Sequence, residues 1–148
     1  MRSEIGQTTP REGLFFGGSM KIKVYELLAA YPEFVAILNE SIPQANSAEL
    51  LTTRAVVYTR RLVRRLAADF EEYSKARNDV AKDCGAEPDE TGAWSLTGEP
   101  LKAFMEKWSP MAEEEIEVDA FLLELGLFEG THFSDRRIAA IEPFIKEE

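Results

Sequence analysis

Cysteine and histidine are almost absent from this sequence, which has one of each, Cys84 and His132. A single cysteine excludes an internal disulfide framework and fits a reducing compartment. A single histidine leaves a Ser-His-Asp or Cys-His arrangement only one base, far along the chain from Cys84. The sequence also lacks a Walker-type phosphate loop and a Cys-x-x-Cys pair. We therefore expect a protein that is not an enzyme and that holds no cofactor or metal.

Positive charge is scarce as well, with 17 basic against 27 acidic residues and a formal net charge of -10. General affinity for nucleic-acid backbone or for anionic membrane surfaces needs positive charge. No apolar run approaches the roughly 18 residues of a membrane span, and the N-terminus lacks the regions of a secretory signal. We therefore expect an intracellular protein that binds neither membranes nor nucleic acid in general.

Residues 1–19 lack the period of a helix or a strand and end in Gly17-Gly18-Ser19, directly before a second methionine, Met20. Either a tag with a linker or a start codon assigned too early would explain such a segment. The apolar residues 14–16 within it also leave room for a docking role. We expect residues 1–19 to lie outside the fold and residues 20–148 to form a single helical domain.

Apolar residues at steps of three and four predict several helices. Two short helices are expected between Ile22 and Leu38, separated at Tyr31-Pro32, with Ile42-Pro43 ending the second. Asn46 and Glu49 form a capping pair for a long helix that runs to Cys84 and stops at Gly85. Its apolar stripe is longer than the chain can easily cover. The preceding helices can cover only part of it, so the rest must meet the C-terminal segment or another protein. The stripe comprises Leu51, Ala55, Tyr58, Leu62, Leu66, Phe70, Tyr73, Val80 and Cys84.

The second half of the chain mixes short helices with two strands. Residues 89–92 predict a turn, and residues 93–97 a strand that pairs with the alternating strand 116–120. A helix opens at Glu99-Pro100 and kinks or ends at Ser109-Pro110, and Ser134 caps a last short helix. The predicted fold is mainly α with a small β-hairpin (α+β), in which a long-helix hairpin packs with short helices and a two-stranded sheet.

The order of these segments resembles a family of small proteins of tailed bacteriophages whose function is unknown. The resemblance covers nearly everything after Met20. It implies a helical hairpin with a small sheet, an origin in a phage genome or prophage, and an accessory role in virion assembly or in handling the host. The segments that carry it are KIKVYELLAAYPEFVAILNESIP, RRLVRRLAADFEEYSKARNDVAKDCG, DETGAW, LKAFMEKW, EIEVDAF and SDRRIAAIEPFI.

A cluster of arginines marks the long helix as the first candidate site. Arg60/Arg64 and Arg61/Arg65 are like-charged neighbours four residues apart and should repel mildly. Either acidic groups of the same domain, such as Asp69, Glu72 and the C-terminal half, balance the cluster, or it docks carboxylates or phosphates of a partner. The candidate partner-binding residues here are Arg54, Tyr58, Arg60, Arg61, Arg64 and Arg65.

A row of carboxylates between residues 113 and 119 is the second candidate site. It lacks the spaced oxygen ligands and the turn glycine of a calcium loop, so a solvated face is the simplest interpretation. The alternative is an acidic surface that imitates nucleic acid or occupies the basic cleft of a host enzyme. The row comprises Glu113, Glu114, Glu115, Glu117 and Asp119. Three aromatic residues, Trp94, Phe104 and Trp108, are expected in the core.

Together these patterns predict a non-catalytic phage accessory or virion-assembly protein that binds another phage protein, with self-association through the long helix left open. The expected location is the host bacterial cytoplasm, free or in association with the virion. The alternative is an inhibitor of a host polymerase, nuclease or defence protein. The sequence does not choose between these partners.

Overall fold

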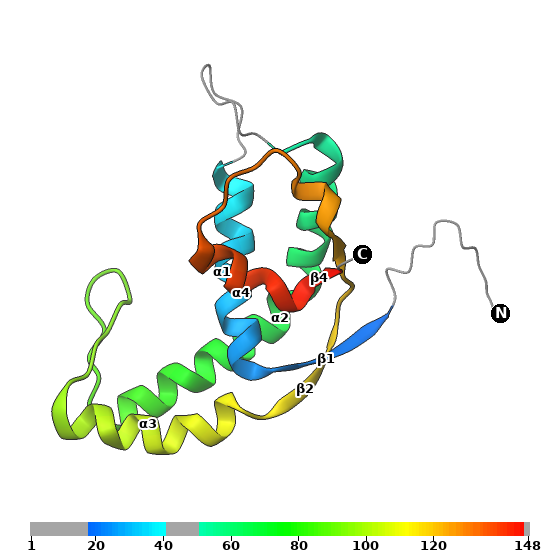
Figure 1. Cartoon of the computed structure of the whole chain (residues 1–148). Coiled ribbons are helices and arrows are strands. Elements are labelled where there is room, and N and C mark those ends of the chain that lie inside the picture. The colour runs from blue at the N-terminus through cyan, green and yellow to red at the C-terminus, as the bar shows by residue number, and fades with distance from the viewer. Residues whose placement is uncertain (1–17, 41–50, 147–148) are drawn as a thin grey trace.

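The computed structural model describes residues 18–40 and 51–146, which form a mainly helical protein with small β elements. The predicted fold class is therefore confirmed. A long helix, α2, runs through the molecule and forms a hairpin with α3, while α1 and α4 pack at its other end (Figure 1). Three predicted features lie outside the described residues: most of the expected tag or linker, the Asn46–Glu49 capping pair and Ile42-Pro43. Of residues 1–19, only Gly18 and Ser19 are described.

The main sheet is a two-stranded antiparallel ribbon whose strands are almost a hundred residues apart in the sequence. Strand β1 (Ser19–Lys23) pairs with β2 (Glu115–Asp119), with Ile22 opposite Ile116. The alternation predicted for β2 is confirmed, but its predicted partner, residues 93–97, is not a strand. That segment is instead held across the end of α2, because the Trp94 indole N–H donates to the side-chain oxygen of Asn78 at 2.9 Å.

Helix α1 (Val24–Glu40) is continuous, so the prediction of two pieces separated at Tyr31-Pro32 was wrong. Pro32 is exposed, whereas the opposite face buries Leu27, Ala30, Phe34 and Ile37 at steps of three and four. Each large side chain gains about 1.5–3 kcal/mol from burial, and an interior proline costs about 3 kcal/mol. The buried face therefore outweighs the proline.

Helix α2 (Thr53–Asp83) has 31 residues and begins later than predicted. Its N-cap is Thr52, whose hydroxyl accepts from the Ala55 backbone N–H at 3.1 Å. At 1.5 Å per residue the helix is about 46 Å long. It stops where predicted, because Gly85 adopts a φ of 103°, which other residues reach only with strain.

Helix α3 (Gly98–Ala112) follows a turn that was predicted correctly. The Asp89 carboxylate accepts from the Thr91 hydroxyl (2.7 Å) and from the backbone N–H groups of Thr91 (2.8 Å) and Ala93 (3.1 Å). These hydrogen bonds, the one from the Thr91 hydroxyl most of all, hold the pKa of Asp89 below its usual range. The helix continues two residues past Pro110, because the N–H of Glu113 still reaches the carbonyl of Ser109 at 3.1 Å. The predicted stop at Ser109-Pro110 was therefore too early.

The C-terminal segment folds back over α1. Strand β3 (Leu123–Glu124) pairs in parallel with β4 (Ile145–Lys146), and two 3-10 turns, η2 (Leu125–Phe128) and η3 (Glu142–Phe144), flank helix α4 (Asp135–Ile141). The predicted cap of α4 is confirmed, since the Ser134 hydroxyl accepts from the N–H of Arg137 at 3.1 Å. Arg137 then fastens α4 to α1 through Glu33 and Glu40.

Two hydrophobic cores lie along α2. The larger core joins α1, the first half of α2 and the C-terminal segment, and the smaller one joins the second half of α2 with α3. Phe104 and Trp108 are buried in the smaller core and Trp94 is half-buried against it, which confirms the core placement predicted for them.

The apolar stripe of α2 packs within the domain, where Ala55, Leu62 and Leu66 are buried and the remaining members are half-buried. The large apolar side chains that are exposed in the described part of the chain lie on other elements. Of the two covers that the sequence left open, the C-terminal segment is present on the first half of the helix, and α3 packs on the second half. An uncovered apolar stripe therefore no longer motivates a partner. The exposed side chains are Tyr25, Leu101, Met105, Met111, Leu122, Leu125 and Ile138.

Candidate partner-docking face

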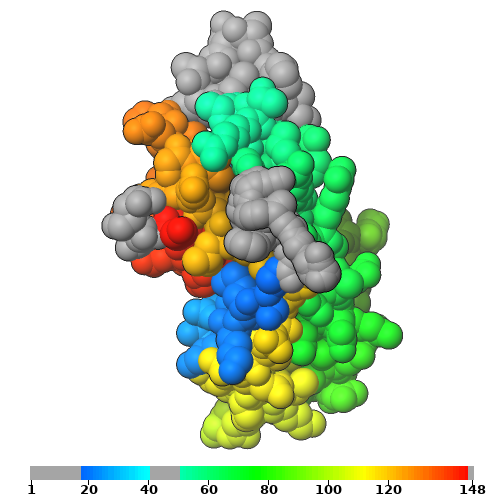
Figure 2. All heavy atoms as spheres, turned by 90° about the vertical axis from the view of Figure 1, so that its right-hand side faces the viewer, coloured from blue at the N-terminus to red at the C-terminus, as the bar shows by residue number. Residues whose placement is uncertain are grey.

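The predicted arginine cluster forms a broad basic surface on the first half of α2, on which Arg60 and Arg64 lie roughly 100° around the helix from Arg54 and Arg65. Four of its arginines are exposed and Arg65 is half-buried. This part of α2 reaches the surface beside the C-terminal segment, which Figure 2 shows as the teal and orange regions. We use the name basic face for Arg54, Tyr58, Arg60, Arg61, Arg64 and Arg65.

Local electrostatics of the helix work against such a cluster. The first turn of α2 has no acidic residue and instead carries Arg54, close to the positive end of the helix dipole. The pairs Arg60/Arg64 and Arg61/Arg65 add like-charge repulsion at one-turn spacing, about 0.2–0.5 kcal/mol each. The helix therefore concentrates positive potential at a cost to its own stability, which is typical of a binding surface.

Acidic groups of the domain balance only part of the basic face. Arg65 pairs with Asp119 at 2.7 Å, and Arg54 lies 3.5 Å from Glu124. Across residues 18–40 and 51–146, Arg60 and Arg64 have no carboxylate within 4.0 Å.

The helix's own acids do not supply the balance that we expected from them. Asp69 and Glu72 form no ion pair with the arginines in the described structure. They lie instead near Tyr73, whose pKa is raised by burial first and then by the charges of Glu72, Glu114 and Asp69. Of the acids predicted to balance the cluster, those that pair with its arginines in the described structure come from the C-terminal half: Asp119 pairs with Arg65 and Glu124 with Arg54.

Tyr58 organises the middle of the basic face. Its half-buried ring has the guanidinium carbons of Arg54 and Arg61 at 5.5 and 5.6 Å from its centroid. Such cation–π contacts contribute about 0.5–1 kcal/mol each at exposed sites. Arg65 lies in the same way over Phe121, at 5.5 Å. These rings hold three guanidinium groups in place, so the face has a defined shape as well as a charge.

The carboxylate row is engaged within the domain. Glu113 pairs with Lys23 at 3.1 Å and thereby raises the pKa of that lysine. Glu117 accepts from the Ser19 hydroxyl at 2.9 Å, and Glu114 contributes charge near Tyr73. The structure thus separates these residues from the arginines except through Asp119.

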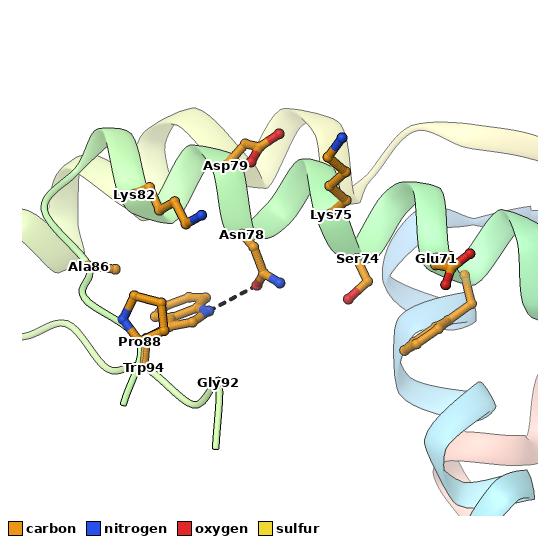
Figure 3. Close-up of a pocket in the computed structure, with 11 residues that line it drawn as sticks. Glu71, Ser74, Lys75, Asn78, Asp79, Lys82, Ala86, Pro88, Gly92 and Trp94 are labelled. Atoms are coloured by element: carbon orange, nitrogen blue, oxygen red, sulfur yellow. Dashed lines mark hydrogen bonds between the residues drawn. The ribbon is translucent and has the colours of Figure 1, made fainter. Parts of the chain in front are cut away.

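A cleft along the second half of α2 is a feature that the sequence did not indicate. It has a volume of about 440 Å³. Phe70 and Trp94 are among its lining residues, and Ser74 and Asn78 point into it from the helix (Figure 3). The cleft depends on the hydrogen bond between Asn78 and Trp94, which are 16 residues apart. No sequence period reports such a contact.

Groups that could support catalysis are dispersed. His132 is exposed three residues before α4, whereas Cys84 is half-buried and is the C-cap of α2. Within the described ranges no three His, Cys, Asp or Glu side chains are grouped so as to hold a metal ion, and no helix there has the length and apolarity to cross a membrane.

Comparison with family models, with curated proteins and with solved structures found no match to this chain.

Proposed function

We propose that this protein is a phage-encoded accessory or virion-assembly protein that acts without catalysis, by docking an acidic segment of another phage protein onto its basic face. The observation that carries the proposal is the pair Arg60 and Arg64, which project from α2 without an acidic neighbour in the described structure, on a chain of net charge -10. The phage origin rests on the resemblance of the sequence segments.

The chemistry of the basic face favours carboxylates of a protein. Arginine forms paired hydrogen bonds with carboxylates, and several exposed guanidinium groups over three turns of helix match a short acidic run. Nucleic acid is disfavoured, because the strong net negative charge of the whole chain repels an extended phosphate backbone. The host-enzyme inhibitor receives no specific support, since Glu113, Glu117 and Asp119 already have partners in the domain.

The double variant Arg60→Gln/Arg64→Gln tests the proposal. Peptides are first selected on the parent protein from a random 20-residue displayed library, and acidic sequences should be enriched. The variant should bind a selected peptide at least tenfold more weakly and with a flatter salt dependence, because exposed charges act through long-range attraction. Anisotropy of the labelled peptide measures both effects.

Lys102→Gln/Lys107→Gln is the matched control, because it removes two exposed positive charges from α3. This control should retain parental affinity. Both variants should unfold within about 1 kcal/mol of the parent, as exposed charges usually allow. A selection that yields no acidic peptides, or parental affinity of the arginine variant at low salt, contradicts the proposal.

A further inference from the structure

The basic face and the cleft lie on one continuous side of α2. Starting from Arg60 and Arg64, the same helical side passes Ala68 and Glu71 and reaches the cleft residues at steps of three and four. The residues of this side that line the cleft are Glu71, Lys75, Asn78 and Lys82. A segment that crosses the basic face along the helix axis therefore arrives at the cleft after roughly 15–20 Å, at 1.5 Å per helical residue.

The walls of the cleft combine flat apolar surface with fixed donors. The Asn78 side-chain oxygen is occupied by the indole N–H of Trp94, so its amide N–H groups are left for another acceptor. The Ser74 hydroxyl points into the cleft next to it (Figure 3). The volume of about 440 Å³ falls in the usual range of ligand pockets, roughly 300–1,000 Å³.

Charges of both signs line the cleft. Glu71 and Asp79 contribute carboxylates, and Lys75 and Lys82 contribute ammonium groups. Lys82 lines the cleft close to its Trp94 end, and the guanidinium of Arg77 lies 5.2 Å from the centroid of the Trp94 ring. The balanced charge of the cleft thus suits an uncharged aromatic side chain of the segment, whereas the acidic side chains lie over Arg60 and Arg64.

We propose that the cleft receives an aromatic side chain of the acidic partner segment, whose backbone carbonyl accepts from Asn78 and Ser74. The ring would lie against Trp94, where offset or edge-to-face aromatic contacts are favourable. The inference rests on the proposed docking function and specifies its ligand: acidic residues over Arg60 and Arg64, followed by an aromatic residue roughly 20–27 Å further along, at the Asn78 end of the cleft.

The peptide selection described above also tests this inference. Enriched peptides should carry an aromatic residue separated from the acidic run by a segment long enough to reach from Arg64 to the cleft. Ser74→Tyr fills the cleft from its helical wall and leaves Trp94 in place, so it should weaken binding of such a peptide at least tenfold. Glu72→Tyr is the matched control on an exposed position of α2 outside the cleft, and it should bind as the parent does.

The selected sequences and the binding of the variants distinguish failure of the cleft proposal from failure of the basic-face proposal. The cleft proposal is overturned if the selected acidic peptides lack an aromatic residue or if Ser74→Tyr binds with parental affinity. In either case, weaker binding by Arg60→Gln/Arg64→Gln still supports docking on the basic face. Loss of the effect at both sites overturns both proposals. Circular dichroism and thermal unfolding confirm that Ser74→Tyr is folded, and a peptide whose aromatic residue is replaced by alanine repeats the test on the unaltered protein. Full affinity of that peptide also overturns the cleft.

Discussion

Thr59 buries a hydroxyl group on the inner side of α2. It is fully buried, and its Oγ1 has no hydrogen-bond partner within the described residues. An unpaired hydroxyl in an apolar environment costs about 1–3 kcal/mol. The helix therefore carries a polar atom that its own fold does not satisfy.

Thr59→Val should raise the free energy of unfolding by about 1 kcal/mol, because valine has nearly the same shape and no group to desolvate. Chemical denaturation followed by circular dichroism measures the change. Thr53→Val, at an exposed position of the same helix, is the control and should change stability by less than about 0.5 kcal/mol. Destabilisation by Thr59→Val would show that the hydroxyl is bonded in solution.

The ion pairs of Arg137 with Glu33 and Glu40 make the stability of the fold depend on pH. The guanidinium donates to Glu40 through both terminal nitrogens at 2.9 Å and to Glu33 at 2.8 Å. The hydrogen bonds from Arg137 hold the pKa of Glu40 below its ordinary value. A lowered pKa in the folded state means that stabilisation is present above the pKa of the unfolded chain and is lost as the pH falls through the folded value.

Glu40→Gln should therefore lower stability at pH 7 by under about 1 kcal/mol, since the pair is partly exposed. The difference from the parent should vanish as the pH falls from about 4.3, the pKa of an unperturbed glutamate, through the lower pKa that Glu40 has in the folded state. Denaturation midpoints across this range measure it. A difference that stays constant with pH would mean that the carboxylate charge does not act through Arg137.

At the scale of elements, the helices were largely predictable and their boundaries were not. Gly85 correctly indicated the end of α2, and Ser134 the start of α4, because helix caps and left-handed stops depend on the residues next to them in the sequence. The continuity of α1 through Pro32 was hidden, since it depends on the burial of the opposite face by elements distant in sequence. Local signals thus predicted helices well where no tertiary contact competed with them.

Strand pairing and the candidate site show the same division. The alternation in residues 116–120 predicted β2, but its partner β1 lies almost a hundred residues away and no turn marks the pairing. The arginines of the basic face were identifiable from spacing alone. The individual acids that pair with these arginines could not be identified from the sequence, because Asp119 and Glu124 reach Arg65 and Arg54 only after the C-terminal segment has packed on α2.

The whole molecule consists of two unequal cores on one rod. The smaller core contains Val24, Ala81, Ala86, Phe104 and Trp108, whereas the larger contains most of the remaining buried side chains. Few buried apolar residues imply a lower local free energy of opening. The end of the molecule that carries α3 and the cleft should therefore open before the rest.

Phe104→Ala should lower the stability of this end by about 3–5 kcal/mol through the loss of buried aromatic surface. Amide hydrogen exchange should then accelerate across residues 81–112, while α1 and α4 keep their protection. Met105→Ala, on the neighbouring residue that is 49% exposed, is the control and should have little effect. Equal loss of protection in α1 would show that the two cores unfold together.

The ribbon of β1 and β2 has a consequence for the order of events during synthesis. Ser19 emerges from the ribosome early, but its partner, Asp119, follows a hundred residues later. At about 5–20 residues per second, the first strand waits at least several seconds with unpaired backbone groups. Helices α1 and α2 can form meanwhile from local contacts, so the newborn chain holds a helical intermediate whose N-terminal edge is open to any other extended segment. The final strand pairing is thus a late step, and mispairing in that interval is the hazard that this topology carries.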